Sequence, residues 1–128
     1  SLLVPNEDVD MPGGWCLRLT ECAASAAIEP SDAACVIDAD LVGSVFVVRN
    51  RRPGDRLQSL GLAGHTSIKR LFSSRRVPRH LRDDHPLVLC DGEVLWVPGC
   101  GRSERGLIGP ATSRCYVIRL IRRPNESA

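Results

Sequence analysis

The sequence predicts an α+β domain in which β-strands predominate, and three observations favour this class. Short apolar, partly β-branched runs of strand length recur along the chain, at 15–19, 34–38, 45–48 and 114–121. Asp91-Gly92 separates two more such runs, 86–90 and 94–97, in the pattern of a β-hairpin with a tight turn. Helical features are confined to short segments. At 128 residues the chain has the length of a single domain, 1–128.

The first half of the chain offers less distinct elements. Residues 1–13 are acidic and contain two prolines, which predicts an irregular N-terminal segment. Residues 23–32 are alanine-rich but interrupted by Pro30, and fit either a short helix or a loop. The 45–48 run is apolar on both faces, as in a central strand. Pro53-Gly54-Asp55 then predicts a turn.

The second half contains the expected helices and a loop. Thr66 is the expected N-cap of a short helix over 67–73 that has one apolar face. Pro78 is expected to open a second, brief helix as its first residue. Residues 99–110 are glycine-rich and carry two arginines, which predicts a mobile basic loop before the last strand.

The charge of the chain is unevenly distributed. The formal net charge is +2, yet residues 49–82 contain ten of the seventeen lysines and arginines and only one acid, a local balance of +9. Residues 1–48 contain eight acids and a single arginine. A basic field of this density predicts a polyanionic partner, nucleic acid first. Sixteen of the seventeen cations are arginines, which bind phosphate in a bidentate manner.

The cations of 49–82 are spread over a predicted turn and two predicted helices, so they can converge on one surface. Glycines and prolines between them allow backbone amides to approach phosphates. Phe72 is the only aromatic residue between positions 47 and 95, so stacking on single-stranded bases is not expected to dominate. Recognition of a duplex or stem through phosphates and shape fits better. The alternative that these arginines form only a solvated face stays open.

No catalytic constellation and no metal site are predicted. The glycine-rich loop with Lys-Ser/Thr that binds nucleotide phosphates is absent from the sequence. His65, His80 and His85 have no carboxylate or cysteine at ligand spacing and are expected at the surface. The six cysteines fall at 16, 22, 35, 90, 100 and 115. Buried free thiols are favoured for them over three disulfides, and over metal ligation.

Three acids invite a structural interpretation. Asp38 and Asp40 fit a carboxylate pair or, equally well, a solvated turn after a strand, and Asp55 is expected to hold Arg51 or Arg56 in place. No apolar run approaches the roughly 20 residues that cross a bilayer, and no leader opens the chain, so we expect a cytoplasmic protein that does not bind a membrane. The start at Ser1, without Met, suggests a fragment.

Several spaced motifs occur in order along the chain: Asp38-Ala39-Asp40, residues 48–56, Gly61 and Gly64, Ile68 to Phe72, Val77-Pro78, Arg82, Pro86-Leu87 and residues 94–99. Together they resemble the C-terminal domain of bacterial tRNA(Ile)-lysidine synthases. The resemblance covers 36–102, about half of the chain, and no resemblance is found for 1–35 or 106–128.

The resemblance implies a noncatalytic tRNA-binding domain with a layered, β-rich α+β fold, similar to a domain of the phenylalanyl-tRNA synthetase β chain. The family's enzyme is a ligase that uses ATP and lysine, with magnesium, to convert the first-anticodon-position cytidine of tRNA(Ile) into lysidine. That chemistry belongs to an N-terminal domain that this chain lacks. The expected partners are tRNA(Ile), through a stem such as the acceptor stem, and the N-terminal domain; a homodimer through the parent enzyme is left open.

The resemblance also implies candidate tRNA contacts. The residues that match motif positions are Arg49, Arg51, Arg56, Lys69 and Arg82. Those that follow on charge alone are Arg52, Arg70, Arg75, Arg76, Arg79 and Arg102. One departure concerns Arg102, because the family commonly has an arginine two residues after the glycine that corresponds to Gly99, where this chain has Gly101. As an alternative, the arginines pair with the rest of the enzyme and the domain has a docking role.

Overall fold

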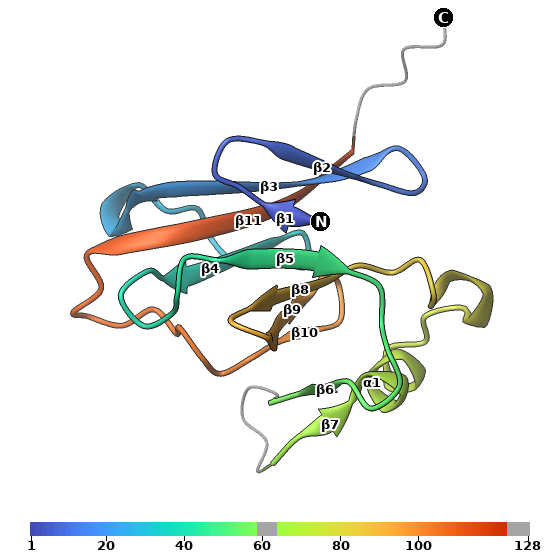
Figure 1. Cartoon of the computed structure of the whole chain (residues 1–128). Helices are drawn as coiled ribbons and strands as arrows, with labels where there is room; N and C mark the ends of the chain where they lie inside the picture. The colour runs from blue at the N-terminus through green and yellow to red at the C-terminus, as the bar shows by residue number, and fades with distance from the viewer. Residues whose placement is uncertain (59–63, 123–128) are drawn as a thin grey trace, which may run out of the picture.

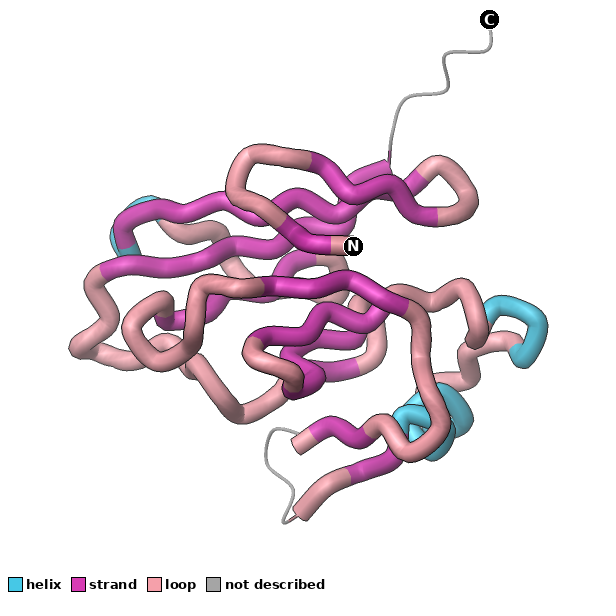
Figure 2. Tube along the Cα trace, in the orientation of Figure 1, coloured by secondary structure: helices cyan, strands magenta, loops and turns pink. Residues whose placement is uncertain are grey.

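The computed structural model describes residues 1–58 and 64–122, which form three layers (Figure 1). The first layer is a four-stranded sheet, the second a five-stranded sheet, and the third a short helix with a two-stranded ribbon. Every pairing between the named strands is antiparallel. Strands and loops make up most of the trace, and helix is confined to a few turns (Figure 2). The predicted β-rich α+β class is therefore confirmed.

The four-stranded sheet has the order β2-β3-β11-β4. Its centre is the long pair formed by β3 (Trp15–Ala23) and β11 (Arg114–Arg122), which match residue for residue along their whole length. Strand β2 (Asp8–Met11) lies at one edge and β4 (Ala34–Asp38) at the other. The predicted strands at 15–19, 34–38 and 114–121 are confirmed, although the first continues for four further residues.

The five-stranded sheet has the order β1-β5-β8-β9-β10. Its members are β1 (Leu2–Leu3), β5 (Phe46–Arg49), β8 (Leu87–Cys90), β9 (Glu93–Val97) and β10 (Gly101–Arg102). The predicted hairpin is the β8–β9 pair. Its two turn residues, Asp91 and Gly92, have φ of 53° and 82°, as the tight turn between twisted strands requires.

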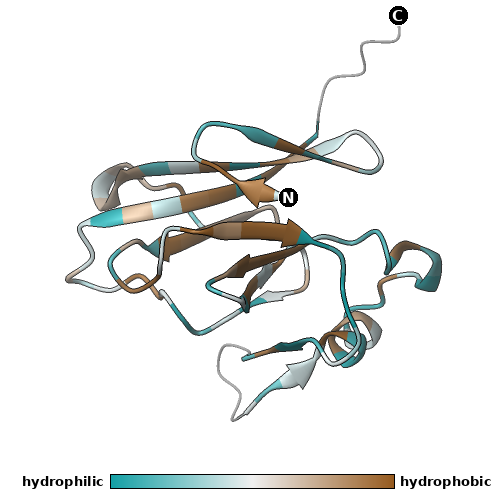
Figure 3. Cartoon of the chain, in the orientation of Figure 1, coloured by the Kyte–Doolittle hydropathy of each residue, from teal (hydrophilic) through white to brown (hydrophobic). Residues whose placement is uncertain are grey.

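This middle sheet is buried on both faces, which explains its continuous apolar runs (Figure 3). On β8, Val88 and Cys90 contact the four-stranded sheet, whereas Leu87 and Leu89 contact the helix side. Phe46 packs edge-on against Tyr116 across the two sheets, with ring centroids 5.0 Å apart. The prediction that 45–48 forms a central strand is confirmed by β5, which lies between β1 and β8.

The N-terminal segment is not irregular as predicted, because residues 1–13 contain both β1 and β2. Leu2 pairs with Val47, and Leu3 lies in the main core with 2% of its surface exposed. The alternation of acidic and apolar residues in Asp8–Met11 is that of an edge strand, and two glycines with positive φ turn this strand back into β3. Burial of Leu3 thus ties the start of the chain to the middle sheet.

The third layer consists of α1 (Ile68–Ser74) and a ribbon of β6 (Arg56–Leu57) and β7 (Thr66–Ser67). The apolar face of α1 is buried against the middle sheet, as predicted. The N-cap is Ser67 and not Thr66, since the Ser67 hydroxyl accepts a 3.1 Å hydrogen bond from the Arg70 amide. Gly61, one of the motif glycines, lies outside the described residues.

Two short 3₁₀ segments complete the described elements. Segment η2 (Arg79–Leu81) follows Pro78, so a brief helix forms where one was predicted, although Pro78 caps it and is not its first residue. Segment η1 (Ala24–Ala26) is a single turn, and the rest of 23–32 lacks helix. Within the part of the chain that the structure describes, no helix is long and apolar enough to span a membrane.

All six cysteines are free thiols, as favoured from the sequence. Five of them are buried, and Cys22 is partly exposed. Burial raises the pKa of the Cys35 thiol to about 11, and it also raises the pKa values of Cys90, Cys100 and Cys115. These side chains therefore act as small apolar groups of the core.

Candidate nucleic-acid interface

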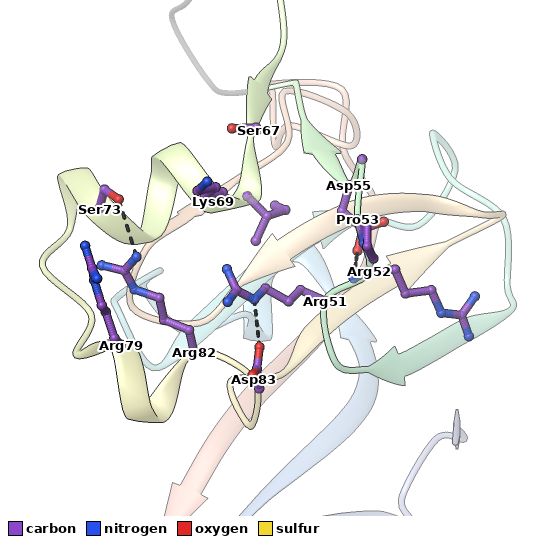
Figure 4. A pocket seen from close by; sticks show the side chains of 12 residues that line it. Arg51, Arg52, Pro53, Asp55, Ser67, Lys69, Ser73, Arg79, Arg82 and Asp83 are labelled. Atoms are coloured by element: carbon purple, nitrogen blue, oxygen red, sulfur yellow. Dashed lines mark hydrogen bonds and ion pairs between the residues drawn. The ribbon is translucent and has the colours of Figure 1, made fainter.

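A groove of about 770 Å³ lies between the turn that follows β5 and the α1–η2 segment (Figure 4). Five of the predicted contact residues line it, namely Arg51, Arg52, Lys69, Arg79 and Arg82. They come from three separate stretches of the chain: the turn, the exposed side of α1, and η2 with the residue that follows it. The convergence expected from the sequence therefore occurs for about half of the basic block.

The turn at the start of the groove is fixed by Asp55. Its carboxylate accepts hydrogen bonds of 2.7 and 2.9 Å from the two terminal nitrogens of Arg49, and one of 2.6 Å from the Arg52 amide. The bonds from Arg49 are the main cause that holds the pKa of Asp55 below its ordinary value. Gly54, with φ of 85°, supplies the left-handed conformation that the turn needs.

This arrangement corrects the expected role of Asp55, which binds Arg49 and neither Arg51 nor Arg56. The reason is the turn itself, which brings residue 55 back beside the end of β5. The Arg49 side chain is only 18% exposed and its charge is offset by Asp55. Arg49 therefore shapes the groove from behind and does not line it.

Arg51 is held in the groove from two sides. Its guanidinium carbon lies 5.6 Å from the centre of the Phe72 ring, and its Nε donates a 3.1 Å hydrogen bond to Asp83. Arg82 is held by two hydrogen bonds to the α1 segment and the residues after it. Its Nε donates to the Val77 carbonyl at 2.9 Å, and one of its terminal nitrogens donates to the Ser73 hydroxyl at 3.4 Å. Both arginines are thus positioned before any ligand arrives.

Lys69 and Arg79 differ from these two. Among residues 1–58 and 64–122, neither side chain has an ion-pair or hydrogen-bond partner. Lys69 is exposed because the buried face of α1 is taken by Ile68, Leu71 and Phe72. Figure 4 shows the Arg82 guanidinium directed toward Ser73 and the Arg51 guanidinium beside Asp83, whereas Arg52 extends away from Arg51. The groove therefore presents free cations beside pre-positioned ones.

The remaining predicted contacts lie outside the groove. Arg56, Arg70, Arg75 and Arg76 are exposed but do not line it. Arg75 instead borders a separate hollow of about 160 Å³. Each of these four stays a prediction as a tRNA contact.

Arg102 is committed to the fold. Its guanidinium donates to the backbone carbonyls of Ser103, Val36 and Arg105, at 2.9, 2.7 and 2.8 Å. Ser103 is 2% exposed and its amide donates to the Leu95 carbonyl at 2.7 Å. The prediction that all of 99–110 is loop is therefore wrong at 101–102, where β10 pairs with β9, and the bonds of Arg102 and Ser103 tie this segment to the fold.

Two groups expected in solvent are instead packed. His85 is half-buried, with Nε2 2.8 Å from the Pro98 carbonyl and its ring edge-on to Phe72. Burial holds the pKa of His85 below its usual range. Asp38 is 7% exposed and accepts a 2.7 Å hydrogen bond from the Thr112 hydroxyl, so it does not belong to a solvated turn. His65, His80 and Asp40 are exposed.

Sequence reasoning overlooked three polar residues of the groove, Ser67, Ser73 and Asp83. Clustering of cations gives no signal for any of them. The signal for Asp83 was its place directly after Arg82, where the basic block ends in two acids. In the described part of the chain, no group of three or more His, Cys, Asp or Glu side chains is arranged to hold a metal ion.

The fold and the groove define a layered, β-rich α+β domain with a cation-lined groove on its helix side. A sequence profile described as the TilS substrate C-terminal domain matches residues 46–119, and the chain belongs to this family. A crystal structure described as that of the TILS C-terminal domain superimposes with a TM-score of 0.84 at 26% identity, over 98% of each chain.

Curated relatives agree with this assignment. The tRNA(Ile)-lysidine synthase of Geobacter sulfurreducens is 36% identical over 83 residues, which are 65% of this chain and 18% of that protein. The bifunctional protein TilS/HprT of Listeria innocua is 35% identical over 95 residues, 72% of this chain and 15% of that protein. The chain thus spans less than a fifth of the length of these relatives.

The structural match also extends the resemblance found in the sequence. That resemblance covered 36–102, whereas the family profile reaches residue 119 and the crystal structure matches nearly the whole chain. The terminal strands β1 to β3 and β11 therefore belong to the same fold as the motifs. These strands need only apolar residues at buried positions and a backbone that can pair, and many sequences meet both requirements.

Proposed function

We propose that this chain is the noncatalytic domain with which a tRNA(Ile)-lysidine synthase holds its tRNA. The observation that carries the proposal is that five cationic residues from three separate stretches of the chain line one groove. Two of these cations, Lys69 and Arg79, have no partner among the described residues. A cation that the fold leaves without a counterion is available to a phosphate.

The lining of the groove favours a double-stranded stem over a single strand. None of its described lining residues is aromatic, and Phe72, which lies nearby, is covered by Arg51. Single-strand binders depend on stacking of bases on exposed rings, which this groove does not offer. Cations and hydroxyls instead suit phosphates and ribose groups of a helical backbone.

The rest of the reaction is proposed to lie elsewhere in the parent enzyme. We assign ATP, lysine and magnesium to a catalytic domain that is not this chain, and the ligation of lysine to tRNA(Ile) to that domain. The partners of this domain are then a tRNA stem and the catalytic domain itself. The cytoplasm is the compartment that such a role implies.

Affinity measured across salt concentrations tests the proposal. The 128-residue chain is titrated with a tRNA(Ile) transcript, a 12-base-pair RNA duplex and a 12-nucleotide oligo(U). We expect tRNA and duplex to bind more tightly than oligo(U), with a log–log salt slope of about −0.7 to −0.9 for each phosphate contacted. A salt-independent affinity, or no binding at about 50 mM salt, would contradict the proposal.

A docking role is a second candidate for a separate part of the surface. Arg75 and Arg76 are exposed at the end of α1 and lie outside the groove. If they contact the catalytic domain, the double change R75E/R76E weakens association of the two domains and leaves most of the RNA affinity in place. Loss of RNA affinity without loss of domain association would contradict this role.

A further inference from the structure

The groove contains one carboxylate that the fold does not require. Of its two acidic lining residues, Asp55 is bonded by Arg49 and by the Arg52 amide and closes the turn. Asp83 is different: its side chain is 86% exposed, and its contact is the 3.1 Å hydrogen bond from Nε of Arg51. No other hydrogen bond or ion pair of Asp83 exists among the described residues.

Arg51 is well placed to bind a phosphate apart from this contact. The Phe72 ring lies beneath its guanidinium and restricts its motion, which lowers the entropic cost of binding. Its two terminal nitrogens make no hydrogen bond within 1–58 or 64–122. A phosphate can accept hydrogen bonds from these two nitrogens, or it can replace the Asp83 carboxylate at Nε. In either position it is repelled by the negative charge of Asp83.

We propose that Asp83 is a specificity-determining residue of the groove, because its carboxylate competes with RNA phosphates for Arg51. Exposed ion pairs of this kind are weak, so a phosphate can displace Asp83. A ligand that also reaches Lys69, Arg79 and Arg82 overcomes the competition, whereas a ligand that reaches Arg51 alone does not. Such a repulsive element lowers the affinity for short or flexible polyanions more than for an ordered RNA backbone.

This inference rests on the proposed function, and its test uses a neighbouring residue as the control. Asp83→Asn and Asp84→Asn change the charge equally, but Asp84 borders a different hollow, beside Trp15 and His85. We expect D83N to bind the 12-base-pair RNA duplex about twofold, and the flexible 12-nucleotide oligo(U) up to about fivefold, more tightly than D84N does. We also expect its salt slope to be steeper by up to about 0.9, because Arg51 no longer exchanges one anion for another.

A double-mutant cycle then shows whether Asp83 acts through Arg51. The gain from D83N should disappear in the Arg51→Gln background, because the cation for which Asp83 competes is gone. Thermal unfolding of each variant checks that the fold is retained. Equal gains for D83N and D84N, or a gain that persists beside R51Q, would overturn the inference.

Failure of the proposed function gives a different pattern. In that case the wild-type chain and the Lys69→Gln/Arg79→Gln variant show the same affinity for the duplex, whatever residue 83 is. If the wild type binds and K69Q/R79Q does not, the proposed function stands. The comparison of D83N with D84N then decides the inference by itself.

Discussion

Asp55 binds the guanidinium of Arg49 at both terminal nitrogens, at 2.7 and 2.9 Å, and this pair closes the turn that forms one wall of the groove. Both side chains are largely buried, with 18% and 13% of their surfaces exposed. Arg49, which stays a predicted tRNA contact, thus supports the residues that follow it. Arg51 and Arg52 obtain their positions from this turn.

Removal of the Asp55 carboxylate should destabilise the domain. We expect Asp55→Ala to lower the free energy of unfolding at neutral pH by about 1–3 kcal/mol, because Arg49 and the Arg52 amide lose their acceptor. Since the pKa of Asp55 is lowered in the fold, its contribution is present above the ordinary pKa of 3.8 and is lost as pH falls through the lower folded pKa. Urea unfolding at pH 7 and at pH 3 measures this. An equal difference at both pH values would contradict the assignment.

His85 should make stability depend on pH in the mildly acidic range. Burial lowers the pKa of His85 below 6.5, so the folded state binds fewer protons there than the unfolded state. The contribution of His85 to the free energy of unfolding is therefore fully present above pH 6.5 and decreases as pH falls below this value. His85→Gln should reduce this decrease between pH 7.5 and 5.5 in thermal unfolding. An unchanged decrease in the H85Q variant would contradict the assignment to His85.

Gly106 should tolerate no side chain. A Cβ at this position would lie 2.5 Å from Cγ2 of Ile37 and 3.0 Å from Cγ1 of Val42, and φ is 70°. We expect Gly106→Ala to cost about 2–4 kcal/mol, as strain and overlap combine. At Gly109 nothing lies within 4 Å of an added Cβ, so G109A should change stability by less than about 0.5 kcal/mol. Similar costs for both variants would contradict this packing.

Arg102 should matter for stability and not for RNA binding. Its three bonds to backbone carbonyls use the planar spread of the guanidinium, which a lysine cannot reproduce. We expect Arg102→Lys and Arg102→Ala both to lower the free energy of unfolding, by about 1–3 kcal/mol. Duplex affinity, measured where the variants are folded, should stay within twofold of the wild type, or roughly 0.4 kcal/mol. A tenfold loss for R102K would return Arg102 to the interface.

The elements predicted well from the sequence are those decided by neighbouring residues. The Asp91-Gly92 turn depends on local turn chemistry, and the strands around it depend on their apolar runs. Both features can be recognised in the sequence. Strand β1 was missed because two leucines acquire a strand only through pairing with Val47, forty-five residues away from Leu2. The structural bonds of Arg102 were missed for the same reason, since its partner Val36 is sixty-six positions earlier.

The site shows the same division. The sequence indicated that the cations of 49–82 can converge on one surface, and five of these residues line one groove. It did not indicate which cations line the groove. Arg49 pairs with Asp55 behind the turn, whereas Arg51 lies in the turn that this pair closes. The neighbours Lys69 and Arg70 likewise carry the same charge, but only Lys69 lines the groove. Position on the fold, and not charge, separates groove residues from other exposed cations.

The measurement that tests the central claim most directly compares two charge-matched variants of the basic block. Lys69→Gln/Arg79→Gln removes two cations from the groove, and Arg70→Gln/Arg76→Gln removes two exposed cations outside it. For the 12-base-pair RNA duplex, K69Q/R79Q should lose about tenfold or more in affinity and about 1.4–1.8 in salt slope. R70Q/R76Q should lose less than about threefold, as a long-range effect. Equal losses for the two variants would show that RNA senses the charge of the block and not the groove.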